Sequence, residues 1–311
     1  MASRDLPIID IAPFRSGGAA AVAVVADIAR ACRDIGFFIV TGHGVSDVTT
    51  TNLYYSAREF FDSPAKADRV GGPQIMGGIG FAPIGQEALA ATKGVQTPGD
   101  IKESLNFGPR LAGSSWPAQP AGLHAAFADY FAEMERLAHC LRGIFCAAMG
   151  LPEDHFEADF IDDLSALRVI NYPAQTEAPS PGQLRAGAHT DYGFMTILRS
   201  EATPGGLQVQ RRDGVWIDMP AAAGGFVINI ADALMRWTND VFVSTPHRVA
   251  NPPQTARGTA RRQSIAFFVN PSADTCIECL APFCAPGQPV KYPPIRYRDY
   301  IALKTSQAFS S

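Results

Sequence analysis

The pattern of hydrophobic positions predicts short strands and helices in the first part of the chain. Residues 7–11 form an apolar run that is typical of a strand, and apolar side chains at 22, 25, 29 and 32 then follow a helical repeat. Residues 35–40 are a compact apolar run, which predicts a buried strand that ends at the turn around His43. Residues 71–122 are rich in glycine and proline, so we expect a long irregular excursion over the surface there.

A long helix is predicted between residues 121 and 149. Its apolar side chains at 127, 131, 134, 138, 141 and 145 alternate spacings of four and three, which places them on one stripe. Gly150 and Pro152 then end the helix. We expect this helix to cover a sheet, and we interpret its His139 and Cys140 as packing residues and not as metal ligands.

From residue 164 onward the chain changes to a succession of short strands. Apolar or alternating runs lie at 167–172, 194–198, 207–210, 215–219, 225–230 and 264–270. Two of them flank Asp213-Gly214, as in a β-hairpin. The pattern predicts a mainly β fold with flanking helices and a jelly-roll core, also called a double-stranded β-helix. We expect one structural unit, in which an N-terminal region of residues 1–120 packs on a core of residues 121–311.

The balance of charges narrows the choice of partner. The 311 residues include 26 Lys and Arg against 30 Asp and Glu, for a net charge of −4 without a basic block. Such a chain has no electrostatic reason to bind nucleic acid or an anionic membrane, so we expect a small-molecule partner. No apolar run suggests a membrane span or an export signal, and the six cysteines are expected to be reduced thiols. We expect a cytoplasmic protein that is a monomer or a weak homo-oligomer.

His189 and Asp191 are the first candidate metal ligands. Residues two apart in an extended segment point to the same face of a sheet, so both side chains can bind one ion from one side. His247 lies far enough along the chain for it to cross the sandwich and return with a third ligand. Two imidazoles and one carboxylate on a triangular face leave other positions open, which is the arrangement of non-haem Fe(II) oxygenases.

Arg262 and Ser264 show the same two-residue spacing and are expected to share one face of a strand. A guanidinium that points into a barrel keeps its proton, and leaving it without a partner is costly. No neighbouring strand offers an evident carboxylate, so a small dicarboxylate is the expected partner of Arg262, with the Ser264 hydroxyl as support. Tyr172, at the end of an alternating strand, can contribute its phenol to the same site.

Further motifs follow one another in order along the chain. They are Leu-Pro-Ile-Ile-Asp from residue 6, Gly-Phe-Phe-Ile-Val from 36, His-Gly-Val from 43, Arg-Glu-Phe-Phe from 58, Lys-Glu-Ser from 102, Asn-Tyr-Pro from 171, Gly-Ala-His-Thr-Asp-Tyr-Gly from 187, Pro-His-Arg-Val from 246, and residues 262–271. In these motifs, and over nearly its whole length, the chain resembles the Fe(II)/2-oxoglutarate-dependent dioxygenases of the isopenicillin N synthase-like group.

The resemblance assigns two sets of residues: the iron ligands His189, Asp191 and His247, and the 2-oxoglutarate ligands Arg262, Ser264 and Tyr172. It implies Fe(II) as the metal, 2-oxoglutarate and O2 as cosubstrates, and oxidation of a C–H bond of a small-molecule metabolite with release of succinate and CO2. One departure is Ile170, where plant-type members usually carry an Asn two residues before the tyrosine. Asn171 would point to the opposite face, so we leave it out of the cosubstrate site.

The candidates for the substrate pocket are Arg168, Tyr192 and Phe268. Arg168 shares a strand face with Tyr172, so it can meet a substrate carboxylate or pair with an acidic residue of the protein. The alternatives left open for the activity are an iron-dependent oxidase of the same fold that does not use 2-oxoglutarate, an ethylene-forming member, and a non-catalytic metal-binding module. The intact metal ligands argue against the last of these.

Other residues of metal-binding type have simpler interpretations. His155 and Glu157 are expected in a solvated surface turn, and His43 in a tight turn. The cysteines at 276, 279 and 284 lack a second Cys or His pair, so ordinary thiols are favoured over a zinc site. The paired glycines at 71–72 and 77–78 lie outside a strand–turn–helix frame, and we interpret them as hinges of a flap near the active site.

Overall fold

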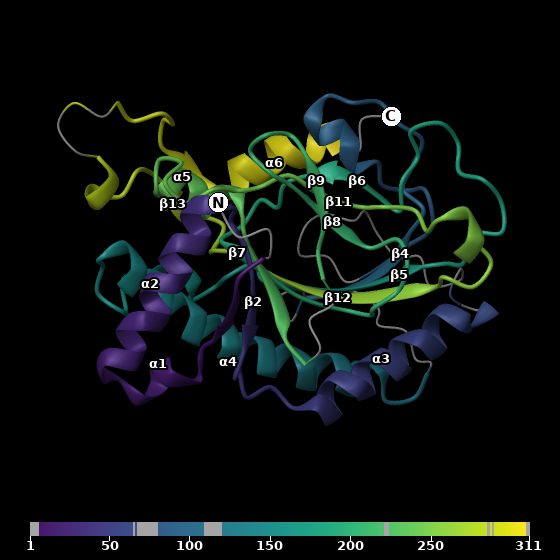
Figure 1. Ribbon diagram of the computed structural model, residues 1–311, viewed down its shortest axis with the longest axis horizontal. Coiled ribbons are helices and arrows are strands. Elements are labelled where there is room, and N and C mark those ends of the chain that lie inside the picture. Colours follow the sequence, from purple (N-terminus) through teal and green to yellow (C-terminus); the bar gives the residue numbers. More distant parts are fainter. Residues whose placement is uncertain are drawn as a thin grey trace.

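Two β-sheets lie face to face, and helices cover the outer face of the larger sheet (Figure 1). The computed structural model describes residues 6–64, 66, 80–108, 120–220, 224–284, 287 and 289–308. A large cluster of buried apolar side chains joins the helices to the larger sheet, and smaller clusters lie between the two sheets. This is the jelly-roll arrangement with flanking helices that the sequence predicts. No helix in these described ranges is long and apolar enough to cross a membrane.

The larger sheet has eight strands. Across the sheet they are β1 (Ile8–Asp10), β2 (Phe37–Thr41), β10 (Phe226–Ile230), β7 (Met195–Ser200), β12 (Arg262–Val269), β5 (Ala166–Tyr172), β4 (Glu103–Phe107) and β3 (Gly80–Ala82). All neighbours are antiparallel apart from the parallel pair of β1 and β2. Strands from the first third of the chain therefore pair directly with strands of the jelly roll in one continuous sheet.

The smaller sheet carries two of the predicted metal ligands. Its strands, in order, are β6 (Ala186–His189), β11 (His247–Val249), β8 (Leu207–Gln210) and β9 (Trp216–Asp218). β8 and β9 form the hairpin that the sequence predicts around Asp213-Gly214. In the antiparallel register of β6 and β11, His247 lies directly opposite His189. A further pair of strands joins β13 (Cys276–Ile277) and β14 (Ile295–Arg296).

Helix α4 packs across the larger sheet, as its apolar stripe predicts. Its Phe131 meets Phe267 of β12 with ring centres 5.0 Å apart, and its Phe145 meets Phe38 of β2 at 6.4 Å. His139 of this helix is exposed and pairs with Glu157, so the packing role expected for it was wrong. The helices are α1 (Ala12–Ser16), α2 (Gly18–Asp34), α3 (Asp47–Asp62), α4 (Leu123–Met149), α5 (Asp232–Trp237) and α6 (Tyr297–Ala308), with short 3-10 turns η2 (Leu89–Lys93), η3 (Glu157–Phe160), η4 (Gln254–Ala256) and η5 (Ala281–Phe283).

The predicted surface excursion of residues 71–122 was wrong for β3 and β4, which belong to the larger sheet. β4 is buried along its whole length, although it carries Glu103 and Asn106. These polar side chains find partners inside the protein: Glu103 accepts from Asn171, and Asn106 accepts from Arg168. Buried polar groups of this kind hide the apolar periodicity on which strand prediction depends. The paired glycines at 71–72 and 77–78 lie outside the described residues.

The expectation of reduced thiols was wrong for two of the six cysteines. Cys279 and Cys284 form a disulfide. The turn η5 between them brings their Cα atoms to 6.4 Å, within the range that such a bond spans. Cys32, Cys140, Cys146 and Cys276 are free thiols, as expected.

Gly36 is a point where the backbone permits no side chain. It follows α2 with a φ of 66°, and a Cβ atom there would overlap the carbonyl oxygen of Val243. Its N–H donates to the carbonyl of Ala31, and its own carbonyl accepts from Ile230 of β10. The next residue, Phe37, packs against the ring of His247 with centres 5.3 Å apart. The conformation of Gly36 thus supports a strand that contacts the predicted metal ligand.

We expect Gly36→Ala to lower the free energy of unfolding by well over the roughly 1–2 kcal/mol that a left-handed backbone conformation costs an alanine, because backbone atoms must also move apart. Gly94→Ala is the matched control: its φ is 74°, but nothing lies within 4 Å of its Cβ position. Urea unfolding followed by circular dichroism measures both costs. Equal losses of unfolding free energy in the two variants would contradict the role of the close approach to Val243.

Candidate metal centre

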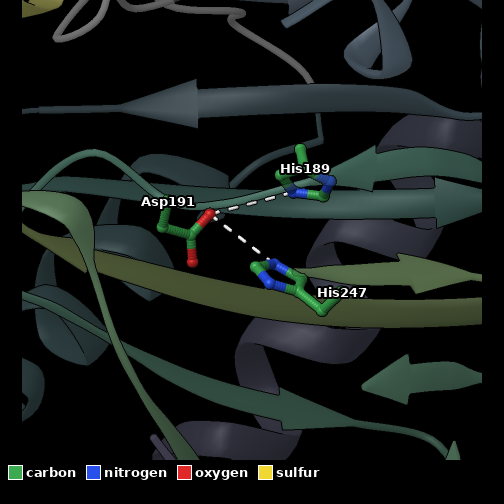
Figure 2. A group of neighbouring side chains, drawn as sticks. All are labelled: His189, Asp191 and His247. Atoms are coloured by element: carbon green, nitrogen blue, oxygen red, sulfur yellow. Dashed lines mark ion pairs between the residues drawn. The ribbon is translucent and has the colours of Figure 1, made fainter. Parts of the chain in front are cut away.

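Three side chains that could hold a metal ion converge between the two sheets (Figure 2). His189 ends β6, Asp191 follows two residues later, and His247 begins β11. The antiparallel pairing of β6 with β11 sets the two imidazoles side by side, with ring centres 4.3 Å apart. The structure therefore brings together the three residues that the sequence singled out.

The ligand atoms of the three side chains form a small triangle. One oxygen of Asp191, Oδ1, lies 3.8 Å from Nε2 of His189 and 3.7 Å from Nε2 of His247. One ligand atom from each residue lies within 4.8 Å of the others, which is close enough for all three to contact one ion. Two imidazole nitrogens and a carboxylate oxygen form the donor set that suits Fe(II) with open positions.

Backbone carbonyls fix the tautomers of both histidines. Nδ1 of His189 lies 2.7 Å from the carbonyl oxygen of Gly187, and Nδ1 of His247 lies 3.2 Å from that of Thr245. A carbonyl can only accept, so each Nδ1 carries the proton, and each Nε2 presents its lone pair to the centre. Burial, together with the nearby His247, lowers the pKa of His189, which keeps this imidazole neutral and ready to bind a metal.

The carboxylate of Asp191 is held from behind. Its Oδ2 accepts hydrogen bonds from Oγ1 of Thr196 at 2.6 Å and from Nδ2 of Asn229 at 2.7 Å. Burial raises the pKa of this carboxyl, but the two histidines and these two donors outweigh burial and lower it overall. Oδ2 is thus engaged by the protein, and Oδ1 stays directed at the histidines. Partners of this kind orient a ligand and tune the metal that it binds.

A cavity of about 160 Å³ opens from this centre between the sheets. Its walls combine the metal-ligand candidates with apolar side chains and a few polar groups. All nine side chains that the sequence assigned to a metal, cosubstrate or substrate role line this one cavity: Arg168, Tyr172, His189, Asp191, Tyr192, His247, Arg262, Ser264 and Phe268. Asn171 is absent from the lining and bonds to Glu103 and Arg261, in line with its predicted opposite orientation.

One end of the cavity carries a positive charge that no carboxylate of the described residues neutralises. Arg262 is only 2% exposed, and its Nη1 has no hydrogen-bond partner among the described residues. Its guanidinium carbon lies 5.0 Å from the centre of the Tyr172 ring, which the register places directly opposite on β5. Ser264 lines the same wall two residues further along β12. A buried guanidinium without a counter-charge suits an incoming carboxylate, such as the far carboxylate of 2-oxoglutarate.

Another wall carries charges that are already paired. Arg168 donates from Nη1 to both carboxylate oxygens of Glu87, at 3.1 and 3.2 Å, and from Nε to Asn106 at 2.7 Å. Lys102 lies 2.9 Å from Glu87 and 3.4 Å from Asp100. Of the two partners considered for Arg168, the structure thus provides the acidic residue of the protein. No sequence pattern pointed to Glu87, because it lies in the segment expected to be an irregular excursion.

His155 and His43 lie where the sequence predicted them. His155 and Glu157 are exposed in a turn after α4. His43 holds a turn, since its Nε2 lies 2.7 Å from the carbonyl oxygen of Gly224 and its Nδ1 accepts from the N–H of Val45. Among the described residues, the group of three metal-binding side chains that lie close together is His189, Asp191 and His247.

Family models match two long parts of the chain. The model of the 2OG-Fe(II) oxygenase superfamily matches residues 164–271, and a model described as the N-terminal part of the non-haem dioxygenase in morphine synthesis matches residues 6–124. A homoarginine-6-hydroxylase of Arabidopsis thaliana is 31% identical over 89% of this chain and 88% of its own length. A 2-oxoglutarate-Fe(II) type oxidoreductase of Emericella nidulans is 27% identical over 99% of this chain and 92% of its own length.

Solved structures give the same result. A full-length Neurospora crassa protein in complex with alpha-KG and thymine superposes with a TM-score of 0.86 at 28% identity, over 97% of this chain and 96% of that one. JOX2 in complex with 2OG, Fe and JA superposes with a TM-score of 0.79 at 28% identity, over 96% of this chain and 84% of that one. These relatives confirm the resemblance that the motifs indicated: the chain belongs to the 2OG-Fe(II) oxygenase superfamily and is a non-haem iron, 2-oxoglutarate-dependent oxygenase.

Proposed function

We propose that His189, Asp191 and His247 hold Fe(II), and that the cavity beside them is where a small molecule is oxidised. The observation that carries this proposal is the triangle of one carboxylate oxygen and two Nε2 atoms at the wall of the cavity. The carbonyls behind both Nδ1 atoms keep the lone pairs of the Nε2 atoms directed inward. When bound, Fe(II) supplies the activation of O2 that links conversion of 2-oxoglutarate to succinate and CO2 with oxidation of a substrate C–H bond.

We assign the far carboxylate of 2-oxoglutarate to Arg262, with support from Ser264 and Tyr172. The guanidinium of Arg262 is buried and has an unbonded Nη1, so a carboxylate there gains a charge-assisted hydrogen bond and relieves the cost of the isolated charge. Ser264 lies on the same strand face as Arg262, and Tyr172 lies opposite Arg262 on the neighbouring strand β5. This leaves the keto-acid end of 2-oxoglutarate toward the metal ligands.

The substrate itself is proposed to lie against Arg168, Tyr192 and Phe268. The guanidinium carbon of Arg168 lies 5.8 Å from the centre of the Phe268 ring. Because Glu87 and Asp100 balance the charges of Arg168 and Lys102, the described residues leave no net charge on this wall. We therefore propose that the substrate is a small metabolite without net charge. Its polar edge contacts the guanidinium of Arg168, and its apolar part contacts Phe268.

We also propose how the chain is organised and where it acts. The region of residues 1–120 packs on the oxygenase core of residues 121–311 in one structural unit, which acts in the cytoplasm as a monomer or a weak homo-oligomer. The continuous sheet of β1 to β4 with the jelly-roll strands supports the first part of this proposal.

The reaction is tested by measuring succinate in aerobic mixtures of protein, Fe(II) and 2-oxoglutarate with sets of uncharged and anionic metabolites. We expect an uncharged metabolite to stimulate succinate release and to be oxidised in equal amount. Oxidation of a metabolite without any need for 2-oxoglutarate would favour the iron-dependent oxidase. Ethylene release from 2-oxoglutarate would favour the ethylene-forming reaction.

His247→Ala is expected to weaken Fe(II) binding by more than about 100-fold and to abolish turnover, since loss of a ligand exceeds the usual effect of losing a supporting group. Iron content after gel filtration and succinate release measure the two effects. His155→Ala, which changes an exposed histidine, is the control and should match the wild type. Full activity of His247→Ala with bound iron would refute the ligand role.

Arg262→Ala is expected to weaken 2-oxoglutarate binding by about 3–5 kcal/mol, the usual cost of breaking a buried charge pair, which is more than 100-fold in Kd. Isothermal titration of the Fe(II)-loaded protein under argon measures this loss, and iron content should stay normal. An unchanged affinity for 2-oxoglutarate would rule out the assignment of Arg262.

Glu87→Gln is expected to lower the free energy of unfolding by about 3 kcal/mol at neutral pH, because it removes the buried carboxylate shared by the buried Lys102 and the partly buried Arg168. Burial raises the pKa of Glu87, but Arg168 and Lys102 outweigh burial and lower it from 4.5 to about 2. The stabilisation is therefore complete above pH 4.5, and the difference from wild type should shrink as the pH falls toward 2. Urea unfolding across this range tests it, with the exposed Glu177→Gln as control.

A further inference from the structure

Arg185 is a second buried cation near the proposed cosubstrate site. Its side chain is 0% exposed, although it precedes β6 in a loop. Its Nη1 donates to the carbonyl oxygens of Pro204 and Gly205, at 3.2 and 2.8 Å, and its Nη2 donates to that of Ala260. No carboxylate pairs with it among the described residues, and its Nε has no hydrogen-bond partner. Carbonyl oxygens satisfy some of its donors, but they do not neutralise its charge.

Arg185 and Arg262 flank the same aromatic ring. The guanidinium carbons of Arg185 and Arg262 lie 6.0 and 5.0 Å from the centre of the Tyr172 ring. Burial, with the like charge of Arg262, lowers the pKa of Arg185 to about 10, so the side chain stays protonated at neutral pH. Two cations thus share an enclosed region in which no protein carboxylate of the described chain pairs with either. Their mutual repulsion falls when an anion binds between or beside them.

We propose that Arg185 is a specificity-determining residue for the cosubstrate, because its charge makes the site select a dicarboxylate 2-oxo acid over a monocarboxylate one. The proposal rests on the proposed binding of 2-oxoglutarate at Arg262. Arg185 does not line the cavity, so it acts across Tyr172 through its field and without touching the ligand. A monocarboxylate 2-oxo acid has no charge at this end of the cavity and gains little from that field.

A purely structural role makes a different prediction. Arg185 ties the loop before β8 to the residue that precedes Arg261 and Arg262, and a variant could simply misplace Arg262. Loss of that brace depends on the hydrogen bonds of the guanidinium and not on its charge. A lysine retains the charge but cannot reproduce the forked donors, and a glutamine retains a donor but no charge. The two variants therefore separate the effect of the charge of Arg185 from the effect of its hydrogen bonds.

The test is the Kd of Fe(II)-loaded protein for 2-oxoglutarate and for 2-oxovalerate, which has the same chain length but no far carboxylate, by titration calorimetry under argon. We expect Arg185→Gln to weaken 2-oxoglutarate by about tenfold or more, since a unit charge several ångströms away at an effective dielectric constant near 20 supplies such a factor. Its affinity for 2-oxovalerate should change by less than about threefold, and Arg185→Lys should keep 2-oxoglutarate within about threefold of wild type. Arg199→Gln is the matched control: Arg199 also donates to a backbone carbonyl and lies 5.7 Å from a ring centre, but that ring is Phe226, which, unlike Tyr172, does not line the cavity.

Three results would overturn the proposal: equal weakening in Arg185→Gln and Arg185→Lys, parallel weakening of both 2-oxo acids, or an unchanged affinity of Arg185→Gln for 2-oxoglutarate. Melting temperatures and iron content are measured on the same samples. If Arg185→Gln does not fold, Arg185→Lys alone still decides, because a tenfold loss in a folded, charge-retaining variant contradicts the proposal. Failure of the wild type to bind 2-oxoglutarate would instead refute the proposed function, so the two failures are distinguishable.

Discussion

The rest of the site depends on the contacts of the Asp191 carboxylate, whose two oxygens face different partners. Oδ2 is fixed by Thr196 of β7 and Asn229 of β10, both in the larger sheet, and Oδ1 faces two histidines that belong to the smaller sheet. The metal-binding triangle therefore exists only when the two sheets are packed together. Packing of α4 against the larger sheet, and the pairing of β2 after Gly36 within that sheet, thus have a direct consequence for the chemistry. The ligand geometry is a product of the whole fold and not of one loop.

Charge is distributed unequally around the cavity, and the proposed binding places of the two ligands rest on this asymmetry. At Arg168 and Lys102 the cations are matched by Glu87 and Asp100, so this wall is balanced before a ligand arrives. At Arg262 a buried guanidinium has no protein counter-charge among the described residues, so this end favours an anion. This difference supports the proposed binding of a doubly charged 2-oxo acid at Arg262 and of an uncharged metabolite at Arg168.

Sequence patterns predicted the parts of the site that depend on local geometry. The two-residue spacings of His189 with Asp191 and of Arg262 with Ser264 set side chains on one strand face, and these residues do line one cavity. Sequence patterns do not reveal the hydrogen-bond and ion-pair partners that only long-range packing brings to the site. Thr196 and Asn229 look like ordinary strand residues, and Glu87 lies in a loop whose apolar periodicity is absent. β4 was missed for the same reason, because its Glu103 and Asn106 are buried in pairs that form only in the folded sheet.

The most direct test is the visible absorption of the Fe(II)-loaded protein during anaerobic titration with 2-oxoglutarate. If the cavity holds Fe(II) at the histidine–aspartate triangle and 2-oxoglutarate between the metal and Arg262, a weak charge-transfer band will grow until one molecule of 2-oxoglutarate is bound per iron. Addition of O2 will then bleach the band and release succinate. Tight iron binding without such a band, and without succinate after O2, would contradict the account.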